Sequence, residues 1–548
     1  MMMLVQPHNV ASAFVKNAEK FGDRTFVRVT TGKEAHDYSF ASIRDQAYAY
    51  NAHFRRAGLT PGSVIAIILT HSVELYTAFL GSMMAGLVPT IMPFPTPKQD
   101  REKYWSSHKD LFALSGINAV FTYQDNVRDI QEYLGDQIRF LAIAGDVDFT
   151  TLDDRIEHGA LAVLQHSSGT TALKKGVMLT HDAIFNQVAH YSRSIGLNEL
   201  SKIVTWLPLY HDMGFIACFL TPMVLGCQIS HLDAFVWSAR PTILLDEIEQ
   251  FGGEYTWLPN FAYNHIANSV RRSREWDLGS VKAIINCSEP CKPDTFAVFH
   301  AVPQFRNLSR NALQVCYAMA ENVFAVSQTD LDSAPHVVRI TEQSFRDGAH
   351  IELAGGDEGI AILSCGRVID GTSVAIVAPS GERVDEEKLL GEVVITGDSL
   401  YSGYYHRPEI TARKLVDGWH HTGDVGFLLD GELFVTGRLD DLLIIRGKNI
   451  YAHEVEEAVN ALDLVIPGRA VAFSLFTEGK GEASLIILAE GDDVSKEKEI
   501  GAAIRRAVEA VFGVSLADFR LLPPRSLRKT TSGKLSRSEN SRLYLEIK

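Results

Sequence analysis

The chain has 548 residues, of which 46% are apolar and 22% are charged, and its formal net charge is −15. This length exceeds what one hydrophobic core usually supports, so we expect at least two domains with a cleft between them. The acidic balance argues against nonspecific binding to nucleic acid or to an anionic membrane surface, because both would repel the average field of the protein.

Alternating element types predict the fold of the first two thirds of the chain. Short β-branched runs lie between longer segments with helical periodicity, at Val64–Leu69, Ala119–Tyr123, Val204–Leu207, Ala283–Asn286 and Gln314–Tyr317. Such alternation favours an α/β fold in which helices flank parallel sheets.

Two uncharged stretches are long enough to be weighed as membrane spans, Leu75–Pro97 and Met213–Ser230. Glycines and prolines interrupt both of them. Each stretch is therefore interpreted as a helix followed by a buried strand.

The character of the sequence changes twice further along. From Gly359 onward, strands and turns such as GIAILSCG and GEVVITG predict a β-rich subdomain at 359–437. After Arg438 the pattern is that of a small α+β domain, with Leu443–Ile445, His453–Leu462, Ser484–Ala489 and Glu497–Phe512 as its elements. We expect a large N-terminal domain at 1–437 and a small C-terminal domain at 438–548.

The cysteines and the N-terminus indicate a cytoplasmic protein. Six cysteines are scattered through the chain, at Cys218, Cys227, Cys287, Cys291, Cys316 and Cys365, and we expect reduced thiols. Cys287 and Cys291 lack a second pair at ligand spacing, which favours buried thiols over a metal site. The N-terminal residues do not have the pattern of a secretory signal, so the mature chain is expected to start near Met1.

The sharpest local signal is the segment Leu164–Thr180, which reads LQHSSGTTALKKGVMLT. A predicted strand enters a loop of hydroxyl residues, one glycine and two lysines, and such a loop can surround phosphates with N–H groups, hydroxyls and an ammonium. The spacing of a Walker loop is missing. From this segment alone, a polar surface turn stays open as an alternative.

Taken in order, several motifs resemble one known group of enzymes. They are SSGTTALKKG, LPLYHDMG, SEP, YAMAE, HTGD, GRLDDLLIIRGKN and TTSGK, spread from position 167 to 534. Their order is similar to that of the acyl-adenylate-forming superfamily, which includes acyl-CoA synthetases and nonribosomal adenylation domains. The phrases LQHSSGTT, WLPNFAYN and CYAMAEN resemble the fatty acyl-AMP ligases in particular, as does an extra stretch around Thr341–Asp357.

This resemblance implies an activity and its cofactors. ATP and Mg²⁺ would activate a carboxylic acid, expected to be a fatty acid, as acyl-AMP with release of pyrophosphate. The acyl group would then pass to the phosphopantetheine thiol of an acyl carrier protein. An acyl-CoA synthetase, which transfers the acyl group to coenzyme A, is the alternative, and an inactive scaffold with the same fold is a third possibility.

The resemblance also implies residues that act on ATP. Lys534 corresponds to the catalytic lysine that bridges the carboxylate and the α-phosphate, and Lys175 to the lysine of the phosphate loop. Glu321 corresponds to the Mg²⁺ ligand, for which a hard oxygen donor is expected. The nucleotide would be held by Ser167, Ser168, Gly169, Thr170, Thr171, Ser288, Glu289, Pro290, Tyr317, Ala318, Met319, Ala320, Asp424 and Arg438.

Two of these positions depart from the superfamily's usual residues. Ala320 stands where many relatives carry threonine, although alanine is usual in the fatty acyl-AMP ligases, and Ala318 replaces a glycine.

The resemblance also implies which residues bind the acid and which residue forms the hinge. His211 resembles the gate beside the incoming carboxylate, while a buried, hydrogen-bonded histidine at a helix start is an equal alternative. The acyl pocket is expected at Tyr210, Met213, Gly214, Asn260 and Phe261. Asp440 matches the hinge about which the C-terminal domain would swing as a mobile lid.

Overall fold

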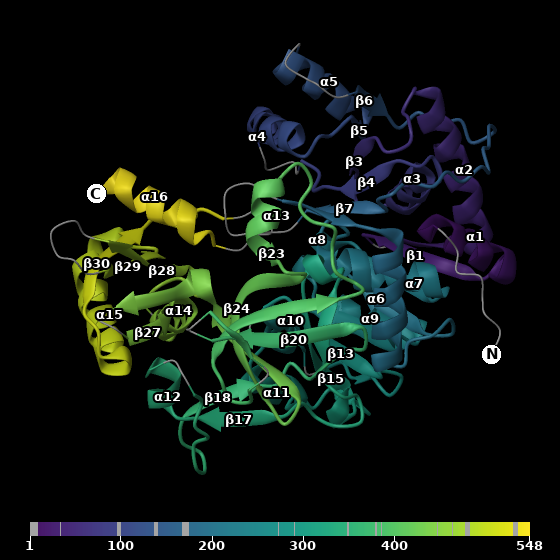
Figure 1. Ribbon diagram of the computed structural model, residues 1–548. Helices are drawn as coiled ribbons and strands as arrows, with labels where there is room; N and C mark the ends of the chain where they lie inside the picture. The colour runs from purple at the N-terminus through teal and green to yellow at the C-terminus, as the bar shows by residue number, and fades with distance from the viewer. Residues whose placement is uncertain are drawn as a thin grey trace.

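The computed structural model describes residues 9–32, 34–95, 100–135, 141–166, 175–271, 273–289, 291–347, 350–378, 381–384, 386–445, 448–462, 464–476, 483–529 and 535–548. Helix α1 (Val10–Phe21) and helix α16 (Arg537–Ile547) lie on opposite sides of the molecule (Figure 1). No helix in these ranges is long and apolar enough to cross a membrane.

A nine-stranded sheet forms the centre of the molecule. Its order is β19 (Arg367–Val368), β16 (Ala325–Gln328), β15 (Leu313–Ala318), β13 (Ala283–Asn286), β11 (Tyr255–Leu258), β9 (Lys202–Thr205), β10 (Gln228–Leu232), β1 (Thr25–Thr31) and β2 (Glu34–Ser39). The strands from β15 to β1 are parallel, and antiparallel strands finish both edges. The predicted α/β class is confirmed.

A second parallel sheet lies beside it, in the order β4 (Val88–Ile91), β3 (Val64–Ile68), β5 (Ala119–Thr122) and β6 (Leu141–Ala144). All residues of β3, β4 and β5 are buried, which explains their continuous apolar sequence. Helix α3 (Val73–Met84) packs closely on α2 (Phe40–Arg56) at Gly81, where a Cβ atom would lie 2.4 Å from the Cβ of Tyr50.

Both uncharged stretches fold as a helix followed by a buried strand, as predicted. The first gives α3 and β4, and the second gives a helix and β10. That second helix begins with a π-helical run, Met213–Leu220, before α7 (Thr221–Leu225), a feature that the sequence did not predict. Gly214 lets the run approach the preceding loop, because a Cβ there would lie 2.5 Å from the carbonyl oxygen of Pro208.

The β-rich region forms an antiparallel sheet in the order β21 (Arg383–Val384), β20 (Thr372–Val377), β22 (Gly391–Gly397), β24 (Trp419–Leu429) and β23 (Leu415–Val416), with β25 (Glu432–Arg438) paired to β24. The sheet starts later than the predicted boundary at Gly359. Strand β18 (Ile360–Leu363) pairs instead with β17 (Val337–Ile340), and β19 extends the nine-stranded sheet. Pairing with strands distant in sequence decides which sheet β18 and β19 join, and the local sequence does not show this pairing.

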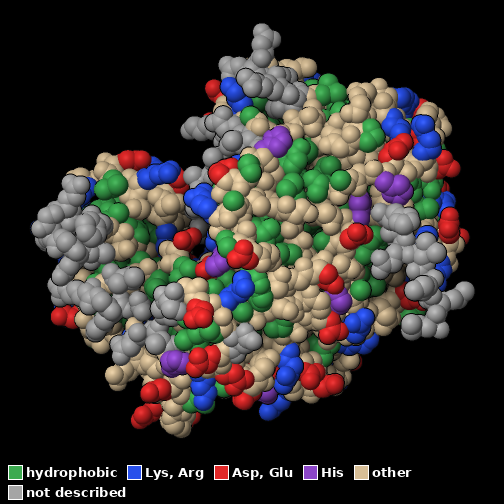
Figure 2. All heavy atoms as spheres, in the orientation of Figure 1, with side chains coloured by type: hydrophobic (Ala, Val, Ile, Leu, Met, Phe, Trp, Pro, Cys, Tyr) green, Lys and Arg blue, Asp and Glu red, His purple; other side chains and the backbone are tan. Residues whose placement is uncertain are grey.

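The C-terminal part has a core of its own, built around β28 (Ala470–Phe476), β29 (Ala483–Glu490) and β30 (Leu516–Leu522). Helices α14 (Ala452–Asn460) and α15 (Glu497–Phe512) pack on this sheet, and α16 (Arg537–Ile547) ends the chain. The predicted elements are confirmed to within about two residues, as expected for element ends. Figure 2 shows a hollow between this part, on the left, and the rest of the molecule.

One ionic cluster ties the start of this part to its last helix. The guanidinium of Arg537 donates to Asp441 at 2.7 Å and to Glu456 at 2.8 Å. Asp441 ends a short 3₁₀ turn, Leu439–Asp441, and Glu456 lies on α14. Burial raises the pKa of Glu456, and Arg537 opposes that rise. The three side chains are mostly buried, so neither carboxylate is well solvated without the arginine.

We expect Arg537→Ala to lower the free energy of unfolding by about 3 kcal/mol, because it leaves two carboxylates desolvated and unpaired. Arg542→Ala is the matched control on the same helix, since Arg542 is 62% exposed and pairs only with Glu539 among the described residues. The control should change the free energy of unfolding by less than about 0.5 kcal/mol. Urea denaturation followed by circular dichroism measures both, and equal effects would contradict the prediction.

Candidate active site

The carboxyl ends of two neighbouring parallel strands bring predicted nucleotide-binding segments together. Ser288 and Glu289 follow β13, while Tyr317 and Ala318 end β15. This edge of a parallel sheet is the usual place for a ligand. Ser288 has a φ of 68°, a conformation that a non-glycine residue seldom adopts and that is often found at binding sites.

Tyr317, Asp424 and Arg438 meet in one cluster from three separate strands. The Tyr317 hydroxyl donates to Oδ2 of Asp424 at 2.6 Å, and Nε of Arg438 lies 3.2 Å from Oδ1. Asp424 and Arg438 are register partners on the hairpin of β24 and β25. Burial raises the pKa of Asp424, although Arg438 and the Tyr317 hydroxyl act to lower it. The carboxylate is thus positioned from two sides and presents acceptor oxygens at the site.

Glu321 sits in the turn that follows β15, within the 3₁₀ segment Ala320–Asn322. Its Oε1 accepts a hydrogen bond of 2.7 Å from the hydroxyl of Tyr404. Its carbonyl accepts from the backbone of Tyr401 at 2.8 Å. The turn is strained, because Val323 has a φ of 60°, and the buried side chain of Asn322 braces it by donating to the carbonyl of Ala325.

Cations gather around these carboxylates. The ammonium of Lys175 lies 5.1 Å from the centre of the Tyr404 ring. Burial lowers the pKa of Lys175, Glu321 acts to raise it, and Lys414, Arg407 and Arg438 lower it further. This local excess of positive charge stands out in a protein of net charge −15 and suits a polyanion.

The segments expected near the acid are also placed close to this cluster. Asn286 donates to the side chain of Asn260 at 2.9 Å, and the backbone of Phe261 donates to Glu289 at 3.2 Å. The predicted adenine segment and this part of the predicted acyl segment therefore touch each other.

The remaining predicted acyl residues lie on one stretch of chain. Tyr210 and His211 have ring centres 4.8 Å apart and directly precede the π-helical run. Met213 and Gly214 are buried in its first turn.

Some predicted residues lie outside the described ranges, namely Ser167, Ser168, Gly169, Thr170, Thr171, Pro290 and Lys534. Of the others, Met319 and Ala320 continue from β15 into the turn of Glu321, and Ala320 is buried. Asp440 is exposed in the 3₁₀ turn between Arg438 and Asp441.

Several residues of the cluster were not predicted from the sequence. Tyr401, Tyr404, Arg407 and Lys414 come from the segment between β22 and β23, and His420 follows them. The hydroxyl of Tyr401 contacts Nδ1 of His420 at 3.2 Å, and burial lowers the pKa of that histidine to about 4. The run YSGYYHRPE, which is rich in aromatic residues and contains His406 and Arg407, is the signal that could have identified Tyr401, Tyr404 and Arg407.

The extra stretch around Thr341–Asp357 touches the C-terminal part. Helix α12 (Glu342–Asp347) carries Arg346, whose guanidinium donates to both carboxylate oxygens of Glu454, at 2.8 and 3.2 Å. Tyr451 is buried between Phe345, with ring centres 5.7 Å apart, and Gly437. A Cβ at Gly437 would lie 2.5 Å from the Tyr451 ring, so only glycine allows this contact.

The chain belongs to the AMP-binding enzyme family, whose model matches residues 14–405. This confirms the resemblance to the acyl-adenylate-forming superfamily. The protein is therefore a ligase of the group that uses ATP to adenylate carboxylic acids.

Two named relatives and one solved structure are similar to this chain over nearly its whole length. The putative fatty-acid–CoA ligase fadD25 of Mycobacterium tuberculosis is 30% identical over 533 residues, which cover 90% of this chain and 89% of the relative. The medium-chain-fatty-acid–[acyl-carrier-protein] ligase JamA of Moorena producens is 27% identical and covers 94% and 91%. A structure from a study of fatty acyl-adenylate ligases from E. coli and L. pneumophila superposes with a TM-score of 0.89, at 25% identity, over 100% of this chain and 99% of that one.

Proposed function

We propose that this protein is a fatty acyl-AMP ligase of the cytoplasm, which converts a fatty acid and ATP into acyl-AMP and pyrophosphate. It then transfers the acyl group to the phosphopantetheine thiol of an acyl carrier protein. The observation that carries the proposal is the cluster of Tyr317, Asp424 and Arg438 beside Glu321 and Lys175. It combines acceptors for a ribose with positive charge for a triphosphate.

The first half-reaction joins two anions, which is its main physical difficulty. A carboxylate oxygen attacks the α-phosphorus of ATP, and the bond to the bridging oxygen breaks to release pyrophosphate. In this proposal Lys175 and the loop at Ser167–Thr171 hold the β- and γ-phosphates, while Lys534 bridges the carboxylate and the α-phosphate. Oriented positive charge at these points stabilises the transition state more than the ground state.

Residues at or near the ends of strands would bind the adenosine part of ATP. Asp424 would accept hydrogen bonds from the ribose hydroxyls, with Arg438 as the second partner of the ribose. Tyr317 would stack on adenine, along which Ser288–Pro290 and Ala318 lie. Met319 and Ala320 would line the phosphate side.

Glu321 fits the expected role of a Mg²⁺ ligand. The donor is a hard carboxylate oxygen held by Tyr404 close to the phosphate-binding cations, and Mg²⁺ usually takes one or two carboxylates together with phosphate oxygens and water. When bound, the ion would neutralise charge on the phosphates.

The same proposal includes the domain division. Residues 1–437 would form the adenylate-forming domain and 438–548 a lid, with Asp440 as the hinge. His211 would gate the entry of the carboxylate. In the second half-reaction the thiol attacks the acyl carbon and AMP leaves.

The acceptor distinguishes the proposal from its alternative, an acyl-CoA synthetase. JamA is named as a ligase for an acyl carrier protein, which supports the first reading. The contact of α12 with α14 supports it also, since it lies in the stretch that resembles the fatty acyl-AMP ligases. The relative fadD25 is named as a fatty-acid–CoA ligase, which favours the alternative, with coenzyme A as the acceptor.

Pyrophosphate release across a panel of carboxylic acids tests the proposal. Each acid is offered ATP and Mg²⁺, with either coenzyme A or a phosphopantetheinylated carrier protein as the acceptor. We expect fatty acids to be activated and the acyl group to appear only on the carrier protein. Efficient formation of acyl-CoA would support the alternative, and activation of no acid would contradict the function.

A further inference from the structure

One lysine beside the candidate active site carries a charge that no described residue pairs. Lys414 ends helix α13 (Pro408–Lys414), which packs on the hairpin of β23 and β24 (Figure 1). Its side chain is half-buried, and its ammonium makes no hydrogen bond or ion pair with any residue that the structure describes. A partly desolvated charge without a partner is unfavourable, so an anion bound at this point would be stabilised.

The two arginines of the same segment are engaged differently. Nε of Arg407 donates to the side chain of Glu409 at 2.7 Å. Arg413 is exposed, and its Nε donates to the carbonyl of Glu409 at 3.3 Å. Among these three cations, Lys414 is thus the one that is available to a ligand.

The ammonium of Lys414 lies against β24, next to the carboxylate assigned to the ribose. A Cβ atom at Gly423 would lie 3.3 Å from Nζ of Lys414, and Gly423 directly precedes Asp424. Burial raises the pKa of Asp424, and Lys414 acts to lower it. Burial also lowers the pKa of Lys175, and Lys414 lowers it further. The charge of Lys414 therefore acts on both the ribose carboxylate and the lysine of the phosphate loop.

The groups around Lys414 do not neutralise it. The carboxylates of Glu321 and Asp424 each accept a hydrogen bond from a tyrosine hydroxyl, and neither forms an ion pair with Lys414. Burial lowers the pKa of His420 to about 4, so this neighbouring ring is neutral at pH 7. The positive charge remains for a ligand to balance.

The order of groups along a nucleotide indicates which anion this is. The α-phosphate lies between the ribose and the β- and γ-phosphates. In the proposed function the ribose is assigned to Asp424 and the β- and γ-phosphates to Lys175, and Lys414 acts on both residues. A nucleotide with its two ends at these residues brings its α-phosphate towards Lys414, whose compact ammonium binds phosphate as a point charge.

We propose that Lys414 binds the α-phosphate of the nucleotide and is a further substrate-positioning cation of the adenylation site. The inference rests on the proposed function, from which it takes the places of the ribose and of the β- and γ-phosphates. Because the α-phosphate passes from ATP into acyl-AMP, Lys414 holds both the substrate and the intermediate. Lys534, in contrast, is assigned to the charge that develops in the transition state.

Lys414→Gln tests the assignment, since it removes the charge and keeps most of the length of the side chain. AMP and adenosine are the probes, because they differ only in the α-phosphate. In calorimetric titrations without added Mg²⁺, we expect the Kd for AMP to rise about 10-fold or more, because a charge-assisted contact is lost. The Kd for adenosine should change by less than about twofold, since adenosine carries no phosphate.

Arg413→Gln is the matched control, because it removes an exposed cation one position away on the same helix. Both dissociation constants should stay within about twofold of the wild type. Lys414→Arg retains the charge and should recover most of the affinity for AMP. Circular dichroism checks folding, and Lys414→Met replaces the glutamine variant if that variant does not fold.

Steady-state kinetics of acyl-AMP formation provide a second measurement. A contact to the α-phosphate exists in the ground state and in the transition state alike, so its loss should raise the KM for ATP by about 10-fold and change kcat less. A lower kcat with an unchanged KM would contradict the assignment.

The binding outcomes separate this inference from the proposed function. A wild type that binds neither AMP nor adenosine would contradict both. A wild type that binds AMP, with Lys414→Gln binding it equally well, would overturn the inference alone. Equal weakening of AMP and adenosine would indicate a distorted site and would overturn it too. Weaker binding of ATP with unchanged binding of AMP would move Lys414 to the β- and γ-phosphates and so overturn the assignment to the α-phosphate.

Discussion

Replacing Lys534 with alanine is expected to lower the rate of acyl-AMP formation by about 10²-fold or more, because oriented charge at the reacting centre often supplies that much stabilisation. The carboxylate of the acid and the α-phosphate of ATP are both anions, and the ammonium of Lys534 is proposed to contact both. The KM for ATP should change little, since the other phosphate contacts remain. Single-turnover formation of acyl-AMP measures the step without interference from product release.

Lys529→Ala is the matched control for this change. Lys529 lies five positions before Lys534 in the sequence and forms a β-bridge with Leu535. It has no assigned role in catalysis. Its loss should leave the rate within about twofold of the wild type, as is usual for exposed positions. A Lys534→Ala variant with an unchanged rate of acyl-AMP formation would contradict the role of Lys534.

Asp424→Ala is expected to raise the KM for ATP by about 10- to 100-fold, because hydrogen bonds to a charged acceptor contribute about 1.5–3 kcal/mol each. The kcat at saturating ATP should fall less. Asp424→Asn retains the size of the side chain and removes its charge, so an intermediate KM is expected. Calorimetric titration with ATP, in the absence of any acid, provides a second measure of the affinity.

Asp370→Ala is the control for the loss of a carboxylate. Asp370 is exposed and pairs with Arg193 at the surface, at 2.8 Å. Its removal should leave the KM for ATP unchanged. If Asp424→Ala lowers kcat without changing the KM for ATP or the calorimetric affinity, the ribose assignment is wrong.

Burial adds a pH dependence to the same site. Because the pKa of Asp424 is raised, its carboxyl group takes up a proton at a higher pH than an ordinary aspartate does. A protonated carboxyl loses charge and one acceptor, so ATP affinity should fall on acidification before ordinary aspartates titrate.

The fold was largely predictable because its strands are buried on both faces. Ala283–Asn286 contains two adjacent isoleucines and is buried throughout, and the observed strand has the bounds that were predicted. The predictions differ from the structure where long-range pairing decides, as at Ile360–Leu363, which joins Val337–Ile340. The π-helical run at Met213–Leu220 was also missed, because the apolar pattern of a buried helix does not show how its backbone hydrogen bonds shift.

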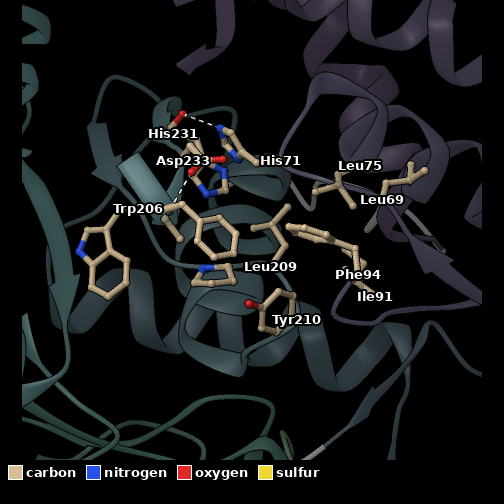
Figure 3. Close-up of a pocket in the computed structure, with 13 residues that line it drawn as sticks. Leu69, His71, Leu75, Ile91, Phe94, Trp206, Leu209, Tyr210, His231 and Asp233 are labelled. Carbon is tan, nitrogen blue, oxygen red and sulfur yellow. Dashed lines mark hydrogen bonds between the residues drawn. The ribbon is translucent and has the colours of Figure 1, made fainter. Parts of the chain in front are cut away.

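The candidate site was predictable only where motifs exist. Tyr317 and Asp424 were implied by two separate motifs of the same resemblance and lie in hydrogen-bond contact, although 107 positions separate them. Tyr404 was not predicted, because none of the motifs that carry the resemblance includes the run YSGYYHRPE in which it lies, yet it binds Glu321. The apolar pocket lined by residues such as Leu69, Ile91 and Trp206 (Figure 3) could not be predicted from the sequence either, because it exists only where the strand ends of two sheets face each other.

The ion pair of Arg537 with Asp441 has a mechanical consequence. The buried side chain of Asn540, on α16, bonds the backbone of Arg528 on both its N–H and its carbonyl. Arg537, on the same helix, joins α16 to Asp441, the residue that follows Asp440. If the chain turns at Asp440, α16 and Arg528 would turn together with Asp441, without first bending the small sheet. The orientation of α16 would then report the hinge angle.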